Sequence, residues 1–426
     1  SVPRAARTSR PPAECLPPGS APVPEGNKMF PIKNNSKHYI MMDEKIRVGI
    51  THGDFNGIGY EVIVKALAAD GITELMTPVV FCDRRLFDRA CKEAGVQFQG
   101  LNIISSAEDA EDGVVNIVDL CLQDISVTPG QPTAASGAAA VKALEEAVRA
   151  VSENDIDVLV TAPISKEAVQ SDSFCFPGHT EFLNARAGEE YKAQMILFDD
   201  RLRVALVTTH LAIADVPAAI TRERVLESIR TFDRVLRKDF AVTRPKIAVL
   251  ALNPHCGDGG LLGREEKEMI APALADAAEE GFLAFGPFAA DGFFAGEARN
   301  RYDGVIAMYH DQGLAPFKAL AGEFGVNFTA GLPWVRTSPD HGTAYDKAWK
   351  DMASEVSMRE AIYKAIDIFR CRRNFLEASG NPLRKMKAEK PEKGKGERKS
   401  GPENHGKEKK NSGENPVQEV RGKEAE

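Results

Sequence analysis

The chain has 426 residues, of which 43% are hydrophobic, so it is long enough for two or three domains with a buried core. Its formal net charge is −8, and removal of both polar ends (residues 1–42 and 381–426) leaves 35 basic and 51 acidic residues, a net charge of −16. An acidic body argues against broad nucleic-acid binding, and no apolar run reaches the length of a membrane-spanning helix.

The two ends of the chain have the composition of disordered segments. Residues 1–42 are rich in Pro, Ser and Arg, and residues 381–426 consist mainly of Lys, Glu, Gly, Asn and Pro. The first segment lacks the apolar stretch of a secretory signal, and a natural start at Met41 or Met42 is favoured over a transit-like leader. The seven cysteines are scattered without a C-x-x-C pair, which is typical of a cytoplasmic protein with free thiols.

Between the ends, strand-like and helix-like stretches alternate. We expect strands at residues 45–51, 76–83, 114–120, 157–163, 193–200, 202–209, 246–253 and 305–309. We expect helices at residues 60–69, 84–95, 136–151, 221–239, 264–280 and 358–376. Residues 325–343 are polar and Gly-rich and are expected to form a long loop. The alternation predicts an α/β fold with a mainly parallel sheet.

A glycine-containing turn, HGDFNGIG at residues 52–59, joins the first expected strand to the first helix. A strand, a glycine turn and a helix together form the common anion-cradling arrangement. The spacing of Gly53, Gly57 and Gly59 is not that of a G-x-G-x-x-G fingerprint, so a plain tight turn explains the stretch equally well.

Three histidines follow expected strands: His210, His255 and His310. Because the carboxyl ends of parallel strands meet at one edge of a sheet, these imidazoles could form a metal site. The alternative is that each is a satisfied polar side chain. Asp311 could orient His310 or could simply cap the turn that is expected there.

Cationic side chains lie close to the same expected edge. Lys318 and Arg336, with Asn327, fall in loop-rich sequence and could form an anion pocket in this acidic body. Lys166 begins a helix after the strand at 157–163, where it could face the ligand or simply be exposed. Thr180 fits a helix cap, which leaves the adjacent His179 unexplained.

Taken together, these motifs resemble the 4-hydroxythreonine-4-phosphate dehydrogenase family of pyridoxal 5′-phosphate biosynthesis. The matching stretches run in family order through residues 46–376: GDFNGIG, TAPISK, PGHTEF, VTTH, LNPHCGDGG, GPFAAD, AMYHDQGLAPFK and GVNFTAGLPWVRTSPDHGTAYD. The chain departs from the family at Phe55-Asn56, Tyr60 and Trp349, where Pro-Ala, Pro and often Gly are usual.

The resemblance implies an isocitrate/isopropylmalate dehydrogenase-like fold with two α/β/α domains and a cleft between them. Residues 43–172 with 346–380 would form the first domain. Residues 173–345 would form the second, with the metal and substrate residues and the dimer interface. The implied protein is a cytoplasmic homodimer with a shared active site and no nucleic-acid or membrane partner.

The resemblance also implies roles for individual residues. Metal ligands, contributed by both subunits to one divalent ion (Zn, Co, Ni or Mg), would be His210, His255 and His310. Substrate-binding residues would be His179, Thr180, Lys318, Asn327 and Arg336. Proton transfer would fall to Asp291 or Lys166. The cofactor, NAD with NADP as the alternative, would be bound by His341, Gly342, Thr343, Ala344 and Asp346.

The implied reaction is an NAD-dependent oxidation of a CH–OH group, converting 4-phosphooxy-L-threonine to 2-amino-3-oxo-4-phosphooxybutanoate. This product decarboxylates to 3-amino-2-oxopropyl phosphate. A dehydrogenase of 4-phospho-D-threonate or 4-phospho-D-erythronate is the same-family alternative. A non-catalytic binding protein that uses its charged tail is the alternative from another class, and the three histidines argue against it.

Overall fold

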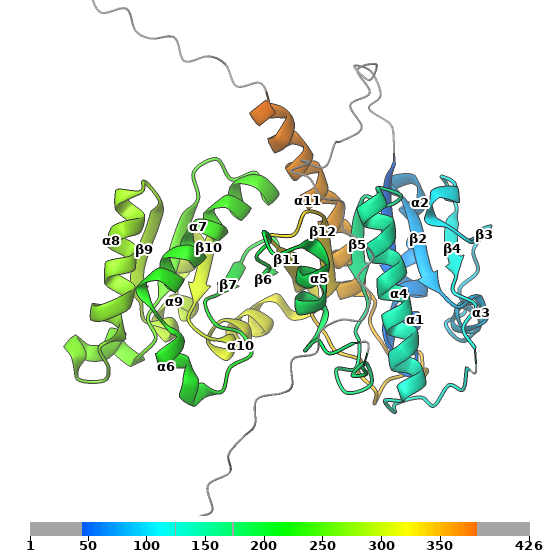
Figure 1. Ribbon diagram of the computed structural model, residues 1–426, viewed down its shortest axis with the longest axis horizontal. Coiled ribbons are helices and arrows are strands. Elements are labelled where there is room, and N and C mark those ends of the chain that lie inside the picture. The colour runs from blue at the N-terminus through cyan, green and yellow to red at the C-terminus, as the bar shows by residue number, and fades with distance from the viewer. Residues whose placement is uncertain (1–44, 124, 173, 381–426) are drawn as a thin grey trace, which may run out of the picture. The chain divides into compact units, whose positions relative to one another are not determined.

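The computed structural model describes residues 45–123, 125–172 and 174–380 (Figure 1). The expected disordered ends, 1–42 and 381–426, lie outside the described residues. The strands are β1 (Ile46–Thr51), β2 (Met76–Cys82), β3 (Leu101–Ile104), β4 (Val115–Asp119), β5 (Val158–Thr161), β6 (Gln194–Phe198), β7 (Arg203–Leu206), β8 (Lys246–Leu250), β9 (Leu283–Phe288), β10 (Gly304–Ala307), β11 (Val326–Ala330) and β12 (Val335–Pro339).

Helices alternate with these strands, as the sequence predicts. They are α1 (Gly59–Leu67), α2 (Ile72–Leu75), α3 (Arg84–Glu93), α4 (Ala134–Glu153), α5 (His179–Ala187), α6 (Val216–Ala219), α7 (Arg222–Asp239), α8 (Ala271–Glu279), α9 (Ala290–Ala295), α10 (His310–Ala321) and α11 (Val356–Gly380). None of the helices in the described part of the chain is long and apolar enough to cross a membrane.

All strands belong to one sheet with the order β3-β4-β2-β1-β5-β12-β11-β6-β7-β10-β8-β9. Pairing is parallel except that β11 runs antiparallel to β12 and β6, and β6 runs antiparallel to β7. The expected α/β class with a mainly parallel sheet is therefore confirmed. The division of the body into two domains, at residues 172/173 and 345/346, stays a prediction.

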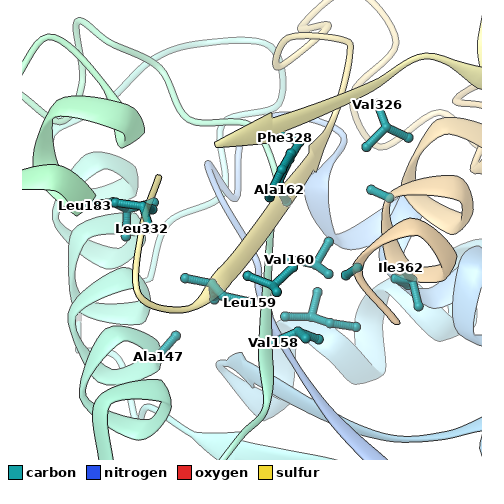
Figure 2. Packing of buried hydrophobic residues seen from close by; sticks show 14 of the residues in the cluster. Ala147, Val158, Leu159, Val160, Ala162, Leu183, Val326, Phe328, Leu332 and Ile362 are labelled. Carbon is teal, nitrogen blue, oxygen red and sulfur yellow. The ribbon is translucent and has the colours of Figure 1, made fainter. Parts of the chain in front are cut away.

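The core lies where helices cover the strands. Figure 2 shows β5 between Ala147 of α4 on one side and Ile362 of α11 on the other. All four residues of β5 are buried, which explains its continuous apolar sequence. At the start of α4, Thr133 and Ser136 form a reciprocal capping box that satisfies backbone N–H groups at this helix end.

Several stretches differ from the sequence-based expectation, and β3 and β9 lie where no strand was expected. The expected loop at 325–343 contains the hairpin β11–β12, which is largely buried. In its strands apolar residues alternate with polar residues that are also largely buried. The polar residues give the segment the composition of a loop, although it forms two strands. The expected turn after His310 is the helix α10, which tolerates Pro316 in its interior.

Candidate active site

A cavity of about 200 Å³ lies where β5, β11 and β12 meet the start of α5. Predicted site residues that line it are Lys166, His179, Thr180, His210, Asn327, Arg336, His341 and Gly342. Other residues of the wall include Thr161, Glu181 and Ser338. The structure therefore brings together residues from four separate sequence motifs.

Arg336 is the central cation of this cavity, although only 2% of its surface is exposed. Its Nε donates to Thr161 Oγ1 at 3.1 Å and one terminal nitrogen donates to Thr329 Oγ1 at 2.9 Å. No carboxylate in the described part of the chain forms an ion pair with it. Burial lowers the pKa of Arg336 to about 9. A buried guanidinium held only by hydroxyl groups is suited to an incoming anion.

Three further polar atoms are buried at this cavity without a hydrogen-bond partner among the described residues: His179 Nε2, Asn327 Oδ1 and His341 Nε2. Buried polar groups are nearly always paired, so unpaired atoms converging on one cavity indicate a polar ligand. Burial, and then the charges of Arg336 and Lys166, hold the pKa of His179 well below its usual value. His179 is thus a neutral imidazole at physiological pH.

The helix α5 presents its first turn to the same space. It is preceded by Gly178, whose backbone is extended, and no side chain caps it. The expectation that Thr180 caps this helix is therefore wrong. Thr180 lies inside the first turn and lines the cavity instead, because Gly178 occupies the capping position.

Lys318 lies beside the cavity and does not line it. Its Nζ is 3.0 Å from Asp340 Oδ1 and 3.0 Å from Asp340 O. Asp340 immediately precedes His341, so this contact fixes the lysine next to the cavity wall. Burial raises the pKa of Asp340, an effect that the charge of Lys318 opposes.

The three strand-end histidines follow β7, β8 and β10, which are neighbours in the sheet. The rings of His210 and His310 lie 6.0 Å apart. The Nδ1 atom of His310 is 2.7 Å from Asp311 Oδ1, and that of His210 is 3.7 Å from Glu181 Oε1. Carboxylates at Nδ1 leave Nε2 as the nitrogen that can bind a metal ion, so this pair fits two ligands of a divalent cation.

His255 does not complete this pair. It lies in an exposed turn after β8 with a left-handed backbone (φ 51°). Within residues 45–380, gaps aside, no three His, Cys, Asp or Glu side chains gather closely enough to hold a metal ion. Asp291, which is exposed in the first turn of α9, lies near this turn, since its charge adds to burial and to the charge of Glu266 in raising the pKa of Cys256.

The predicted cofactor residues, His341 to Asp346, follow β12 and lie on the glycine turn after β1. Ile58 N donates to Thr343 O at 3.1 Å, and Tyr345 donates to Asp54. A Cβ atom on Gly59 would lie 2.1 Å from His52 O, so this glycine permits close packing of the turn. The glycine turn thus supports the segment after β12.

The sequence-based reasoning did not single out Thr161, Glu181 or Ser338. Thr161 and Glu181 lie within the matched stretches TAPISK and PGHTEF, directly beside residues that were identified. The sequence could have indicated them by their positions, because Thr161 ends the strand β5 and Glu181 lies in the first turn of the helix α5. Ser338 lay in a segment expected to be a loop, where the alternation of the strand was not recognised.

Comparisons with known proteins agree with this geometry. The family described as pyridoxal phosphate biosynthetic protein PdxA matches residues 74–365. A 4-hydroxythreonine-4-phosphate dehydrogenase of Bacteroides thetaiotaomicron is 49% identical over 82% of this chain and 96% of its own length. A protein named as a candidate D-threonate 4-phosphate dehydrogenase, from Oceanobacillus iheyensis, is 39% identical over 77% of this chain and 99% of its own.

The structure is also similar to solved ones. The crystal structure of a 4-hydroxythreonine-4-phosphate dehydrogenase from Klebsiella pneumoniae matches with a TM-score of 0.68 and 35% identity, over 76% of this chain and all of that one. The expected fold class is confirmed by this match. Sequence family, relatives and fold agree, and the chain belongs to the PdxA family of pyridoxal phosphate biosynthetic proteins.

Proposed function

We propose that the chain oxidises 4-phosphooxy-L-threonine with NAD⁺, giving 2-amino-3-oxo-4-phosphooxybutanoate, which decarboxylates to 3-amino-2-oxopropyl phosphate. The observation that carries the proposal is the buried guanidinium of Arg336, which forms no ion pair among the described residues although Glu181 also lines the cavity, together with the unpaired polar atoms there. A substrate with a phosphate at one end and a carboxylate at the other would supply an anion that pairs with Arg336 directly.

The residues of the cavity divide the binding task. Arg336 would hold one anionic end of the substrate through its two-pronged guanidinium, oriented by Thr161 and Thr329. No side chain caps the first turn of α5, so the backbone N–H groups of this turn would be available to the anionic end of the substrate. The neutral His179 and Asn327 would complete the hydrogen bonds of the substrate.

Within one protomer Lys166 is the better placed of the two expected proton carriers. It lines the cavity, whereas Asp291 lies outside it near Cys256. A divalent cation at the histidines would supply Lewis-acid chemistry at the reacting centre, and NAD⁺ would accept the hydride. Lys166, in its neutral amine form, would take the proton of the hydroxyl group, directly or through one water molecule.

The incomplete histidine set supports a homodimer with a shared site. Leu211, Ile213, Leu261 and Leu262 flank the two histidine-bearing turns and are exposed, with Leu261 80% exposed. We refer to these four as the histidine-flanking residues. Apolar side chains beside polar ligands are typical of surfaces that another subunit covers. A second copy would then bring the His255 and Asp291 side of its surface to the His210–His310 pair.

The alternative is a dehydrogenase of 4-phospho-D-threonate or 4-phospho-D-erythronate, and the name of the Oceanobacillus relative favours the first of these two substrates. These compounds share the phosphate and carboxylate but carry a hydroxyl in place of the amino group. The cytoplasmic location and the absence of nucleic-acid partners stay predictions.

The deciding experiment measures NADH formation by the full chain, supplied in turn with Zn²⁺, Co²⁺, Ni²⁺ and Mg²⁺, with each of the three substrates. The proposal expects the highest kcat/KM with 4-phosphooxy-L-threonine. A preference for either sugar acid would move the enzyme to the alternative, and no NADH with any substrate and metal would refute both.

A further inference from the structure

The segment that follows β12, residues 341–353, is fixed to the first part of the chain by contacts at both of its ends. Near its start, Ile58 N donates to Thr343 O at 3.1 Å. A Cβ atom on Gly57 would lie 2.8 Å from Thr343 O, so the glycine turn and the segment are in direct contact. The segment contains all five residues proposed to bind the cofactor.

One buried carboxylate makes the main side-chain contact near that end. Asp54 is 1% exposed, and its Oδ2 accepts hydrogen bonds from Tyr345 Oη at 2.9 Å and from Ser136 Oγ at 3.0 Å. Its Oδ1 accepts from the backbone N–H of Asn56 at 2.8 Å. Burial raises the pKa of Tyr345 to about 12, so the phenol keeps its proton and acts as the donor. The carboxylate thus joins the glycine turn, α4 and the segment.

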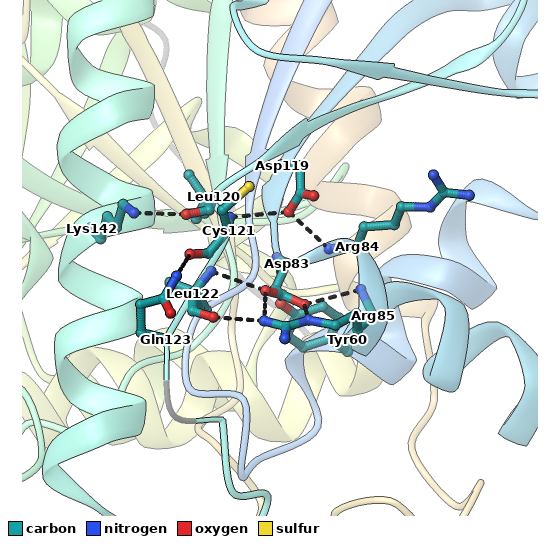
Figure 3. A network of polar contacts seen from close by, with 10 residues as sticks. All are labelled: Tyr60, Asp83, Arg84, Arg85, Asp119, Leu120, Cys121, Leu122, Gln123 and Lys142. Carbon is teal, nitrogen blue, oxygen red and sulfur yellow. Dashed lines mark hydrogen bonds and ion pairs between the residues drawn. The ribbon is translucent and has the colours of Figure 1, made fainter.

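A second contact holds the far end of the segment. Trp349 Nε1 donates to Phe55 O at 2.8 Å, and its ring stacks on Tyr60 with centroids 6.1 Å apart. Tyr60 is itself fixed, because its hydroxyl oxygen accepts from Asp83 N at 3.1 Å within the polar network of Figure 3. This second contact does not involve Tyr345, so loss of the phenol leaves the far end attached.

The backbone between these contacts adopts conformations that ordinary residues rarely adopt. Ala344, directly before Tyr345, has φ 42°, and Trp349 has φ 57°. Left-handed backbone at residues other than glycine persists only where surrounding contacts determine it, and it is found preferentially at ligand-binding segments. The contacts of Asp54–Tyr345 and Trp349 adjoin these positions, and Glu61 and Lys65 hold the end of the segment through Ala353 N and Asp351.

We propose that Asp54 and Tyr345 are positioning residues for the dinucleotide. Their hydrogen bond holds Gly342 to Ala344 in the conformation that receives the cofactor, and neither side chain contacts the reacting atoms. The inference rests on the proposed function, since that function assigns the cofactor to residues 341–346. Removal of this hydrogen bond is expected to loosen the binding segment and to weaken the affinity for the dinucleotide. The turnover number kcat of the enzyme with its cofactor bound should stay nearly constant.

The test replaces Tyr345 by Phe, which keeps the ring and removes the donor. Calorimetric titration with NAD⁺ alone is expected to show binding about 10- to 150-fold weaker than in the unaltered chain, the range for loss of one hydrogen bond to a charged group. KM for NAD⁺ rises by the same factor, and kcat and the substrate KM change less than about twofold. Tyr302→Phe, the same chemical change among the phenylalanines near β9, is the matched control and leaves NAD⁺ binding unaltered.

A double-mutant cycle with Asp54→Ala, which removes the acceptor of the Tyr345 hydroxyl group, tests whether the two side chains act through one bond. Asp54→Ala with Tyr345→Phe is expected to bind NAD⁺ as weakly as Asp54→Ala alone, because the bond is already lost. Emission of Trp349, isolated by Trp334→Phe, reports independently whether the far end of the segment remains packed on Tyr60. Folding of each variant is checked by thermal unfolding.

The outcomes separate the two proposals. If the unaltered chain makes NADH but a folded Tyr345→Phe binds NAD⁺ with unaltered affinity, the positioning role is wrong and the dehydrogenase stands. Additive effects in the cycle would likewise overturn the shared bond. If the unaltered chain neither binds NAD⁺ nor makes NADH, both proposals fail together.

Discussion

Arg336 and Arg372 are both buried arginines, and they differ in what compensates the charge. Arg336 has hydroxyl partners only, whereas Arg372 Nε lies 2.8 Å from Asp239 Oδ1. Burying a charge without an opposite one costs several kcal/mol, as a rule. At Arg372 the carboxylate of Asp239 offsets this cost within the fold. At Arg336 the cost remains until an anionic ligand binds to the guanidinium group.

We predict opposite effects for removal of the Arg336 charge on activity and on stability. Arg336→Met should lower kcat/KM by about 100-fold or more, because a two-pronged contact to an anion is lost. It should raise the melting temperature by about 2–4 °C per kcal/mol of burial cost that is relieved. Steady-state kinetics and differential scanning calorimetry measure the two effects, and a lower melting temperature would contradict this account of the site.

His52 gives a prediction about pH. It is fully buried beside Tyr60, with ring centroids 5.1 Å apart, and burial lowers its pKa to about 4. The unfolded chain therefore binds a proton at His52 between about pH 6.5 and pH 4 while the folded chain does not. Stability contributed at neutral pH is lost as the pH falls through this window.

His52→Gln removes this titration. The loss of unfolding free energy between pH 7 and pH 4.5 should be smaller in the variant by about 2 kcal/mol, the value for a shift of this size. Urea unfolding at both pH values provides the measurement. Equal losses in the two proteins would show that His52 titrates in the folded state at its ordinary pKa.

Among the secondary-structure elements, the strands and helices with strong hydrophobic periodicity were predicted well, whereas β3, β9 and the hairpin β11–β12 were not. Asn327, Arg336 and Ser338 belong to its strands, yet they are polar because they line the cavity. A buried strand is normally recognised by its apolar residues, and in this hairpin polar cavity-lining residues stand at several of those positions. The residues proposed to bind an anion were singled out by their chemistry, while the strands that carry them were expected to be a loop.

The helix α11 gives a prediction at the scale of an element. Arg372 joins it to Asp239 at the end of α7, and its guanidinium also donates to Leu332 O at 3.3 Å in the β11–β12 turn. Arg372→Met leaves Asp239 buried without its partner and should lower the unfolding free energy by about 3–5 kcal/mol. Denaturant unfolding measures this loss. Arg372→Met with Asp239→Asn should recover part of it, and failure to recover any would assign the loss to packing.

For the whole molecule, the prediction concerns assembly. Light scattering is expected to show a dimer, and Leu261→Asp or Ile213→Asp should shift it to monomer and abolish NADH formation, because an apolar surface is made charged. Phe324→Asp, at an exposed apolar residue apart from the histidine-bearing turns, is the control and should stay dimeric. A monomeric, fully active unaltered chain would exclude the shared site. The sequence could not foresee which histidines meet within one chain, because His255 is proposed to join the other two only in the dimer.

The position of β12 has a consequence for how the chain folds during its synthesis on the ribosome. In the sheet it lies between β5 and β11, but in the chain it is synthesised long after β5. Until residue 335 leaves the ribosome, the apolar strand β5 has an unpaired edge, of the kind that joins strands of other chains. Premature termination anywhere between β5 and β12 should therefore yield fragments that aggregate. We expect the nascent chain to require a chaperone until β12 has been synthesised and can pair with β5.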